Sequence, residues 1–321
     1  MRAPEGAEID AQLHLTDEQP QAFAAIPQEV WQVPPSRYLR EEEAFRAWTI
    51  ECADGCYYWS QYTYEDHVGK QLINPSGSEV FAFWDDAQQA TPENIFSGVV
   101  KPVLGSLLRI RGITCLHANV VVVDGRAIAL LGQSGAGKST TTAALLSRGH
   151  TMLTDDIAAI TEDDKGFLVQ PGFPSLSLLP ITVESFFGSS ASFPRVYSFD
   201  DKRYVKLASP GVANGHSAEW RFQSEPSPLV AIYLLSGFAS DFTEPEIEPL
   251  GVAEGLMTLC RNTYRGYMLS KERLSQEFKL LGRMAANVPI KHIRRPKGLE
   301  HLPQLCKVIE EDVQRIMECS S

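Results

Sequence analysis

The sequence predicts an α/β protein with two parts: a small β-rich N-terminal domain, residues 1–90, and a mixed-sheet nucleotide-binding domain, residues 91–321. Two observations predict the larger domain. A glycine-rich stretch, Gly132–Ser139, follows an apolar run and leads into a helix-forming run, and the later segments alternate between strand-like and helix-like patterns. The smaller domain is predicted by aromatic residues gathered near the N-terminus among short runs typical of strands.

In the N-terminal domain, the runs Cys56–Tyr64 and Glu79–Trp84 are predicted to be strands separated by turn residues. Aromatic side chains mostly fill protein cores, so we interpret the aromatic residues as the core of this domain. The alternative, a docking surface for a partner chain, stays open. The residues concerned are Trp31, Trp48, Tyr57, Tyr58, Trp59, Tyr62, Tyr64, Phe81, Phe83 and Trp84.

A hairpin is predicted immediately before the glycine-rich stretch. Two β-rich runs, residues 119–123 and 126–131, flank the dipeptide Asp124-Gly125. This dipeptide between such runs is a strong signal for a two-residue turn, which fixes the strand register. Continued toward the N-terminus, that register puts His117 opposite Gly132, at the mouth of the glycine-rich stretch.

The other elements follow from periodicity and breaker residues. The predicted helices are Pro92–Arg109, a helix after Ser139 that ends at Arg148-Gly149-His150, Glu254–Tyr264, Leu274–Ala286 and a final amphipathic helix, Leu302–Met317. The helix over Leu274–Ala286 carries Leu274, Phe278, Leu281 and Ala285 along one face. The predicted strands are a buried strand over Leu229–Leu235 and an edge strand over Pro289–Arg295.

The glycine-rich stretch reads G-Q-S-G-A-G-K-S and fits the phosphate-binding loop pattern G-x-x-x-x-G-K-[ST]. Glycines let the backbone curl until several N–H groups point at one anion, and the following helix N-terminus favours negative charge. Lys138 is expected to reach the β- and γ-phosphates, and the Ser139 hydroxyl to bind Mg²⁺. The sequence therefore predicts a nucleoside triphosphate site formed by Ser134, Gly135, Ala136, Gly137, Lys138, Ser139 and Thr140.

Two adjacent carboxylates, Asp155 and Asp156, are flanked closely by apolar residues on both sides. Charges in such surroundings are costly unless they bind metal or accept hydrogen bonds. One carboxylate can hold Mg²⁺ through water, and the other is free to accept a proton from an attacking hydroxyl. The alternative is an ordinary turn between strands.

Composition limits the partners and the compartment. A formal net charge of −11 argues against nucleic acid or an anionic membrane as the main partner. No apolar stretch approaches the roughly 18 residues needed to cross a bilayer. The N-terminus lacks the apolar core of a signal peptide, and the cysteines form no C-x-x-C pair. We therefore expect a cytoplasmic protein with reduced thiols.

Four features together resemble HPr kinase/phosphorylase and its relatives: His117 before the hairpin, the loop G-x-S-G-x-G-K-S, the triplet Arg148-Gly149-His150, and the pair Asp155-Asp156. The likeness is specific from about residue 116 to residue 160. It implies an ATP- and Mg²⁺-dependent serine kinase with the family's fold. It also implies that Asp155 is the general base with His117 as its hydrogen-bond partner, that Lys138 is the catalytic cation on the phosphates, and that Ser139 and Asp156 lie near the metal.

The sequence also departs from that family. The bifunctional members carry an L-E-I-R-G-type motif after the aspartate pair, linked to phosphorolysis of the phosphoserine. Residues 171–180 instead read P-G-F-P-S-L-S-L-L-P, with no counterpart of the motif's glutamate. This leaves open whether any phosphorolysis remains, and it removes one carboxylate from the vicinity of the metal. The aromatic N-terminal region also differs from the family's usual sensor domain.

Three segments resemble a divergent branch of that family, encoded with ribosomally made peptides: residues 171–178, residues 201–204 and residues 261–265. Some members of this branch phosphorylate the C-terminal serine of a lasso peptide precursor. Lys202, Arg203 and Arg265 are candidate cations for phosphate or substrate, although charged loop residues are more often simply solvated. Because relatives form hexamers, a homo-oligomer is a further possibility.

The leading hypothesis is a kinase that uses ATP and Mg²⁺ to phosphorylate a serine of a peptide or small protein, without nucleic acid or membrane as partner. A kinase for free serine or a related small alcohol is a second reading. A regulatory module that binds nucleotide without transferring phosphate is a third. The absence of an N-K-x-D element counts against a GTPase, and the absence of L-S-G-G-Q counts against an ABC ATPase.

Overall fold

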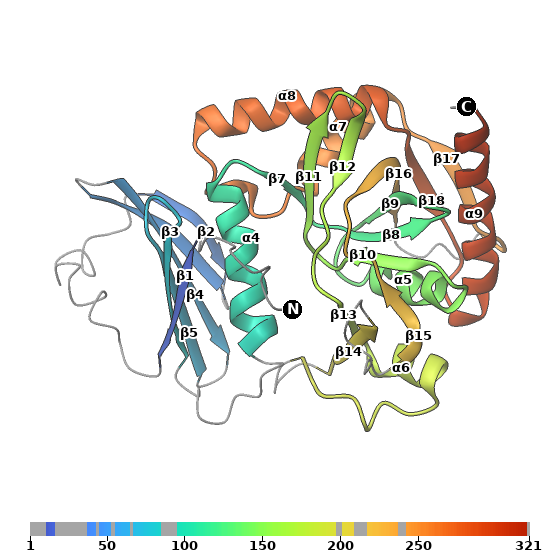
Figure 1. Ribbon diagram of the computed structural model, residues 1–321, viewed down its shortest axis with the longest axis horizontal. Helices are drawn as coiled ribbons and strands as arrows, with labels where there is room; N and C mark the ends of the chain where they lie inside the picture. The colour runs from blue at the N-terminus through green and yellow to red at the C-terminus, as the bar shows by residue number, and fades with distance from the viewer. Residues whose placement is uncertain are drawn as a thin grey trace. The chain divides into compact units, whose positions relative to one another are not determined.

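The computed structural model describes residues 11–16, 37–42, 45–52, 55–64, 67–84, 95–196, 201–208, 217–236 and 242–319. The chain divides into two compact units (Figure 1). The first comprises Met1–Gly112 and Arg265–Leu269, and the second comprises Ile113–Tyr264 and Ser270–Ser321. The boundary thus falls at Gly112, whereas the sequence predicted it at residue 90.

The first unit contains a sheet with the strand order β1-β6-β5-β4-β3-β2. Neighbouring strands are antiparallel, except that β1 and β6 run parallel. Trp59 is buried on this sheet, and Trp48, Tyr57, Phe81 and Phe83 pack against it and Leu72, as expected of core residues. Trp31 lies outside the described residues. The strands are β1 (Gln12–Thr16), β2 (Arg37–Glu42), β3 (Phe45–Cys52), β4 (Gly55–Tyr64), β5 (His67–Ile73) and β6 (Glu79–Trp84).

A helical segment completes the first unit and explains the boundary. The π-helical turn η1 (Phe96–Val100) continues into α4 (Lys101–Ile110), and the predicted helix is thereby confirmed within the described residues. Its apolar residues, among them Val99, Val103 and Leu107, pack against the sheet residues Val80 and Ala82. Because this helix buries its apolar face on the N-terminal sheet, it belongs to the first unit. The short helix η2 (Gly266–Met268) adds Met268 to the same core.

The second unit is built on the predicted hairpin. Its strands β8 (Asn119–Val123) and β9 (Arg126–Leu131) pair with Val123 opposite Arg126, and the two-residue turn is confirmed. Asp124 and Gly125 have positive φ angles of 48° and 78°, as this turn requires. The hairpin lies inside a larger mixed sheet with the order β13-β14-β15-β10-β8-β9-β16-β12-β11-β7, in which β18 also pairs with β16 and β17.

The remaining strands of this sheet are β7 (Thr114–Leu116), β10 (Thr151–Thr154), β11 (Ala158–Asp163), β12 (Gly166–Val169), β13 (Ser175–Leu178), β14 (Arg203–Ala208), β15 (Ser217–Phe222), β16 (Ser227–Leu235), β17 (Glu246–Pro249) and β18 (Ile290–Arg294). The helices are α5 (Lys138–Ser147), α6 (Pro180–Phe187), α7 (Val252–Arg261), α8 (Lys271–Asn287), η3 (Leu299–His301) and α9 (Leu302–Cys319).

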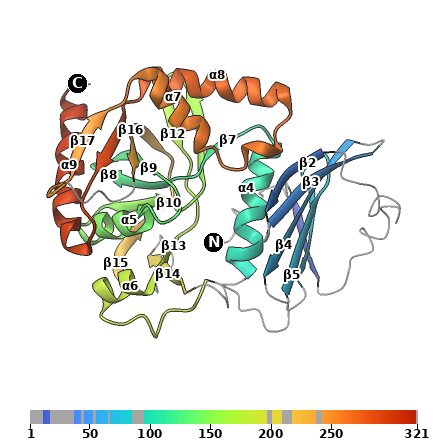
Figure 2. The ribbon, with the colours of Figure 1, turned by 180° about the vertical axis from the view of Figure 1, so that it is seen from behind.

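Alternate residues of the hairpin face opposite layers of helices. Val121 and Leu130 pack with residues of α5 and α9, whereas Val120 and Ala129 pack with residues of α7 and α8. Both ribbon views show α5 and α9 on one side of β8, β9 and β16, and α7 and α8 on the other (Figures 1 and 2). The hairpin is therefore buried on both faces, which holds the turn from β9 into α5 rigidly.

Three predictions need correction. The strand β18 is not at an edge, because β17 pairs along its outer side and β16 along its inner side. The helix α7 ends at Arg261, since Tyr264 N–H donates to the Cys115 carbonyl and draws the chain toward β7. The apolar face predicted for α8 is only half covered: Leu281 and Ala285 are buried, while Leu274 and Phe278 are exposed. The strand β16 and the helix α9 form where they were predicted.

Candidate active site

The glycine-rich stretch forms the turn between β9 and α5, as the sequence predicted. Gly137 precedes the helix with a φ of 85°, and Gly132 has a φ of 147°. A Cβ on Gly132 would lie 2.6 Å from the Leu235 carbonyl oxygen, and one on Gly137 would lie 2.7 Å from the Arg295 guanidinium. Both positions therefore require glycine. Residues 133–135 are exposed at the tip of the loop, where an anion can approach the N-terminus of α5.

Lys138 is buried at the first turn of α5, and its side chain folds back over the loop. Its ammonium donates to the carbonyl oxygens of Gly132 and Gln133, at 2.7 and 3.4 Å. Burial lowers the pKa of Lys138, the carboxylates of Asp156 and Asp155 raise it, and the charge of Lys202 lowers it. The two carboxylates and Lys202 are therefore within electrostatic reach of the loop lysine.

Asp155 follows β10 and is 4% exposed. Its Oδ1 accepts a hydrogen bond from Asn119 Nδ2 at 2.9 Å, and its Oδ2 accepts one from the Ser177 backbone N–H at 3.4 Å. Asp156 is half-buried in the left-handed region with a φ of 67°, which aspartate tolerates better than most residues. The pair occupies a turn between β10 and β11, from which both carboxylates act electrostatically on Lys138.

The sequence patterns did not identify Asn119 as a candidate site residue. It is the first residue of β8, it is fully buried, and its Nδ2 also donates to Ser139 Oγ at 3.4 Å. One side chain thus contacts both the predicted metal ligand of the loop and the predicted base. The available signal was a polar residue opening the otherwise apolar strand N-V-V-V-V.

His117 lies between β7 and β8 and is half-buried. The strand pairing of the hairpin ends at Asn119 and Leu130, so the register does not extend to His117 and Gly132 as predicted. The His117 backbone N–H instead donates to the Asn262 carbonyl at 2.7 Å, and its ring stacks with Tyr264 at 6.5 Å between centroids. A hydrogen bond from His117 to Asp155 stays a prediction.

The three candidate cations lie in different places. Lys202 acts electrostatically on Lys138. Arg203 is half-buried at the start of β14, paired with Leu178 of β13. Arg265 is grouped with the first unit, where its guanidinium donates to Ser106 Oγ and Tyr62 Oη. Of the three, Lys202 is therefore the one that acts electrostatically on the loop lysine, whereas Arg265 contacts Ser106 and Tyr62 within the first unit.

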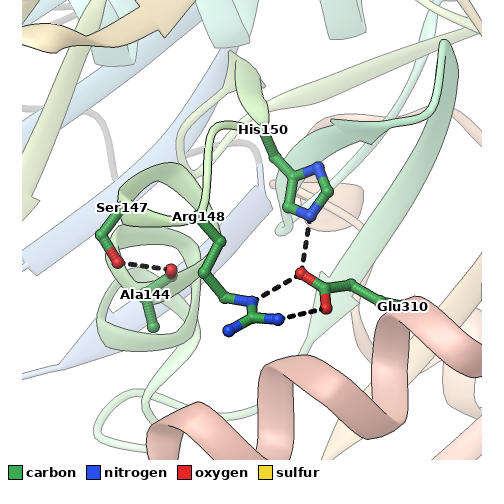
Figure 3. Close-up of polar contacts among 5 residues, drawn as sticks. All are labelled: Ala144, Ser147, Arg148, His150 and Glu310. Atoms are coloured by element: carbon green, nitrogen blue, oxygen red, sulfur yellow. Dashed lines mark hydrogen bonds and ion pairs between the residues drawn. The ribbon is translucent and has the colours of Figure 1, made fainter.

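The triplet Arg148-Gly149-His150 holds the far end of α5 (Figure 3). Arg148 Nε and Nη2 donate to the two carboxylate oxygens of Glu310 on α9, at 2.6 and 2.7 Å. His150 Nε2 lies 2.8 Å from Glu310 Oε1. Arg148 first, and His150 second, lower the pKa of Glu310. The triplet thus fixes the C-terminal end of the helix that follows the glycine-rich loop, and these contacts involve no group of the loop itself.

The donor set near the loop suits Mg²⁺. Within the described residues, no group of three or more His, Cys, Asp or Glu side chains is placed to hold a metal ion. Mg²⁺ usually binds through one or two protein oxygens together with phosphates and water. Ser139 and Asp156, the predicted metal ligands, would supply that number of protein oxygens.

Among the helices that the structure describes, none is long and apolar enough to span a membrane.

Comparison with known proteins finds similarity in the segment that carries this site. The family described as HPr Serine kinase C-terminal domain matches residues 108–175. The HPr kinase/phosphorylase of Geobacillus sp. (strain WCH70) is 41% identical over 56 residues, which is 17% of this chain and 18% of that protein. The HPr kinase/phosphorylase of Clostridium botulinum (strain Eklund 17B / Type B) is 47% identical over 51 residues, 16% and 17% of the two chains.

The chain therefore aligns with less than a fifth of the length of these curated relatives. Among solved structures, the Hpr(Ser) kinase/phosphatase from Coxiella burnetii is 14% identical, with a TM-score of 0.33, over 64% of this chain and 98% of that one. The segment that matches the family contains the hairpin, the glycine-rich loop, the Arg148-Gly149-His150 triplet and the Asp155-Asp156 turn.

Proposed function

We propose, because residues 108–175 match the HPr Serine kinase C-terminal domain family, that this chain is an ATP- and Mg²⁺-dependent kinase for a serine hydroxyl of a peptide or small protein. One observation carries the proposal. Lys138, Asp155 and Asp156 come within electrostatic reach of one another at the N-terminus of α5, where the loop leaves residues 133–135 exposed. Such a set provides a cation for the phosphates, a proton acceptor and a metal-binding carboxylate.

In the proposed reaction the serine Oγ attacks the γ-phosphorus, and the bond from that phosphorus to the β–γ bridging oxygen breaks. The hydroxyl proton passes to the Asp155 carboxylate, and ADP leaves. The loop N–H groups and Lys138 stabilise the phosphate charge. Ser139 and Asp156 would hold Mg²⁺, which would supply further positive charge to the phosphates when bound. Phosphorolysis is not part of the proposal.

The segment after the aspartate pair supports a polypeptide acceptor. The Ser177 N–H donates to Asp155, and Thr182 Oγ1 lies 3.2 Å from Thr140 Oγ1 on α5. Between these two contacts, Leu179 and Ile181 are 49% and 61% exposed. These exposed apolar side chains follow Ser177 along the chain, and they would suit apolar residues that flank a serine in a peptide.

The finer proposal is a C-terminal serine, as at the end of a lasso peptide precursor. Such a serine brings a free carboxylate close to its hydroxyl. Lys202 lies near enough to influence the pKa of Lys138, and it offers a positive charge for that carboxylate.

The test is transfer from ATP, with Mg²⁺, to a panel of serine-ended peptides read by mass spectrometry. A gain of one phosphate is expected, and Asp155→Asn is expected to lower the rate by about 100-fold or more because the proton acceptor is lost. Phosphate on free serine but on no peptide would favour the small-alcohol kinase. Nucleotide binding without transfer to any acceptor would favour the third hypothesis, a regulatory module that binds nucleotide without transferring phosphate.

A further inference from the structure

Asn119 is a polar residue in a strand that is otherwise apolar and buried on both faces. Its amide nitrogen donates to Asp155 at 2.9 Å and to Ser139 at 3.4 Å. These two residues come from different elements, the turn after β10 and the first turn of α5. Asn119 thus contacts both the proposed proton acceptor and the proposed metal ligand of the loop.

The orientation of this amide is fixed by its neighbours. A flipped amide would place Oδ1 against the Asp155 carboxylate, so the nitrogen must face Asp155. The Oδ1 atom is then buried and has no hydrogen-bond partner among the described residues. Leaving a buried acceptor unpaired is unfavourable for folding, and a valine would avoid it. A valine would, however, take one donor from the buried Asp155 carboxylate, so the two donated hydrogen bonds account for asparagine at this position.

We propose that Asn119 is a positioning residue, which holds the Asp155 carboxylate and the Ser139 hydroxyl in fixed relation so that acceptor and metal-bound phosphate meet. This inference rests on the proposed kinase function for its effect on transfer. Its effect on the loop does not depend on transfer: without Asn119, the Ser139 hydroxyl is held less firmly for Mg²⁺. The metal should then strengthen nucleotide binding less than in the wild type.

The experiment uses Asn119→Val in the full chain and measures two quantities. The first is kcat on the peptide acceptor, expected to fall about 10- to 100-fold with little change in the KM for ATP, as for the loss of hydrogen bonds to a charged group. The second is the ratio of the Kd for ATP without and with Mg²⁺, measured by calorimetry. In Asn119→Val this ratio is expected to fall toward the ratio measured for Ser139→Ala. The double variant Asn119→Val/Ser139→Ala should show a ratio no lower than that of Ser139→Ala.

Thr141→Val is the matched control. Thr141 Oγ1 is likewise buried without a hydrogen-bond partner in the described part of the chain, and the substitution preserves shape. It should leave kcat and the Mg²⁺ ratio unchanged. If Asn119→Val fails to fold, Asn119→Ser replaces it, because serine keeps a short hydrogen-bond donor at this position. The serine variant is expected to retain part of the wild-type kcat and part of the wild-type Mg²⁺ ratio.

A folded Asn119→Val protein with wild-type kcat and a wild-type Mg²⁺ ratio would overturn the inference. If the wild type transfers phosphate to no acceptor, the kinase proposal fails, and the Mg²⁺ ratio still decides the role of Asn119. A wild type whose ATP affinity does not respond to Mg²⁺ would overturn the inference as well.

Discussion

The ammonium of Lys138 lies 2.7 Å from the carbonyl oxygen of Gly132, six residues before it in the same loop. The lysine that the phosphates are expected to recruit is therefore held by the loop's own backbone. A bound triphosphate can replace that carbonyl as the partner of the ammonium, with only a small rearrangement of the side chain.

Lys138→Met removes this cation while keeping a long, flexible side chain. We expect transfer to fall about 100- to 1,000-fold, because a preorganised charge near the transferred phosphoryl group is lost. The decrease is measured under saturating ATP, so that weaker binding is separated from slower chemistry. A variant with more than a tenth of wild-type kcat would contradict the assignment of Lys138.

Gly137→Ala should destabilise the loop, and with it the protein. The alanine would have to adopt a φ of 85°, which costs about 1–2 kcal/mol, and its Cβ would meet the Arg295 guanidinium at 2.7 Å. Gly135→Ala is the matched comparison, since Gly135 has a similar φ of 81° but nothing within 4 Å of its Cβ. Thermal unfolding should show the larger loss of stability for Gly137→Ala; equal losses would mean that the Arg295 contact is unimportant.

Glu310→Gln should lower the free energy of unfolding near neutral pH, by removing a contribution that the wild type loses in acid. Arg148 and His150 lower the pKa of Glu310 in the folded protein below its ordinary value of 4.5. The stabilisation is therefore fully present above the unfolded pKa and is lost as pH falls through the lowered folded pKa. Because Arg148 is 39% exposed, the loss near neutral pH should be only about 1 kcal/mol.

Urea unfolding at several pH values measures this effect. The difference between wild type and Glu310→Gln should shrink as the solution is acidified below the ordinary pKa. Glu162→Gln, at an exposed ion pair with Arg283, is the control and should change stability less. A difference that stays constant with pH would show that the Glu310 charge is not what stabilises the contact.

Lys202→Met tests the recognition of a C-terminal serine. If Lys202 binds the acceptor carboxylate, the variant should raise the KM for a peptide ending in free serine about tenfold, as for a lost charge-assisted hydrogen bond. The same peptide with an amidated C-terminus should bind wild type and variant alike. Equal effects on both peptides would instead assign Lys202 to the phosphates.

The local parts of this structure could be predicted from the sequence, whereas the contacts between distant segments could not. Asp124-Gly125 determines its hairpin because the turn conformation depends on those two residues alone. The loop from Gly132 to Ser139 is equally local. Glu310 is far along the chain from Arg148, and nothing in the spacing of either residue indicated their contact.

The candidate site could likewise be predicted only where its residues belong to local motifs. The sequence indicated Lys138 and the aspartate pair from their motifs, but it did not indicate Asn119, whose partner Asp155 is reached only after β10 has paired with β8. The edge position predicted for β18 was wrong because β17 is short and has a weak strand pattern, Glu246–Pro249. Extending the hairpin register to His117 failed because the chain leaves the ladder at Ala118.

One stretch of 38 consecutive positions, residues 119–156, contains the loop, Asn119 and both aspartates. Residues 177–182 follow separately, and they contact this stretch through the hydrogen bonds of Ser177 with Asp155 and of Thr182 with Thr140. Under the proposed function, the residues for phosphate chemistry and those next to the acceptor thus lie in two successive, separate segments of the chain. A change confined to residues 177–182 would then alter the choice of serine and leave the phosphate-binding residues unchanged. Under the proposed function, grafting residues 177–182 from a relative with another acceptor is the shortest route to a kinase of new specificity.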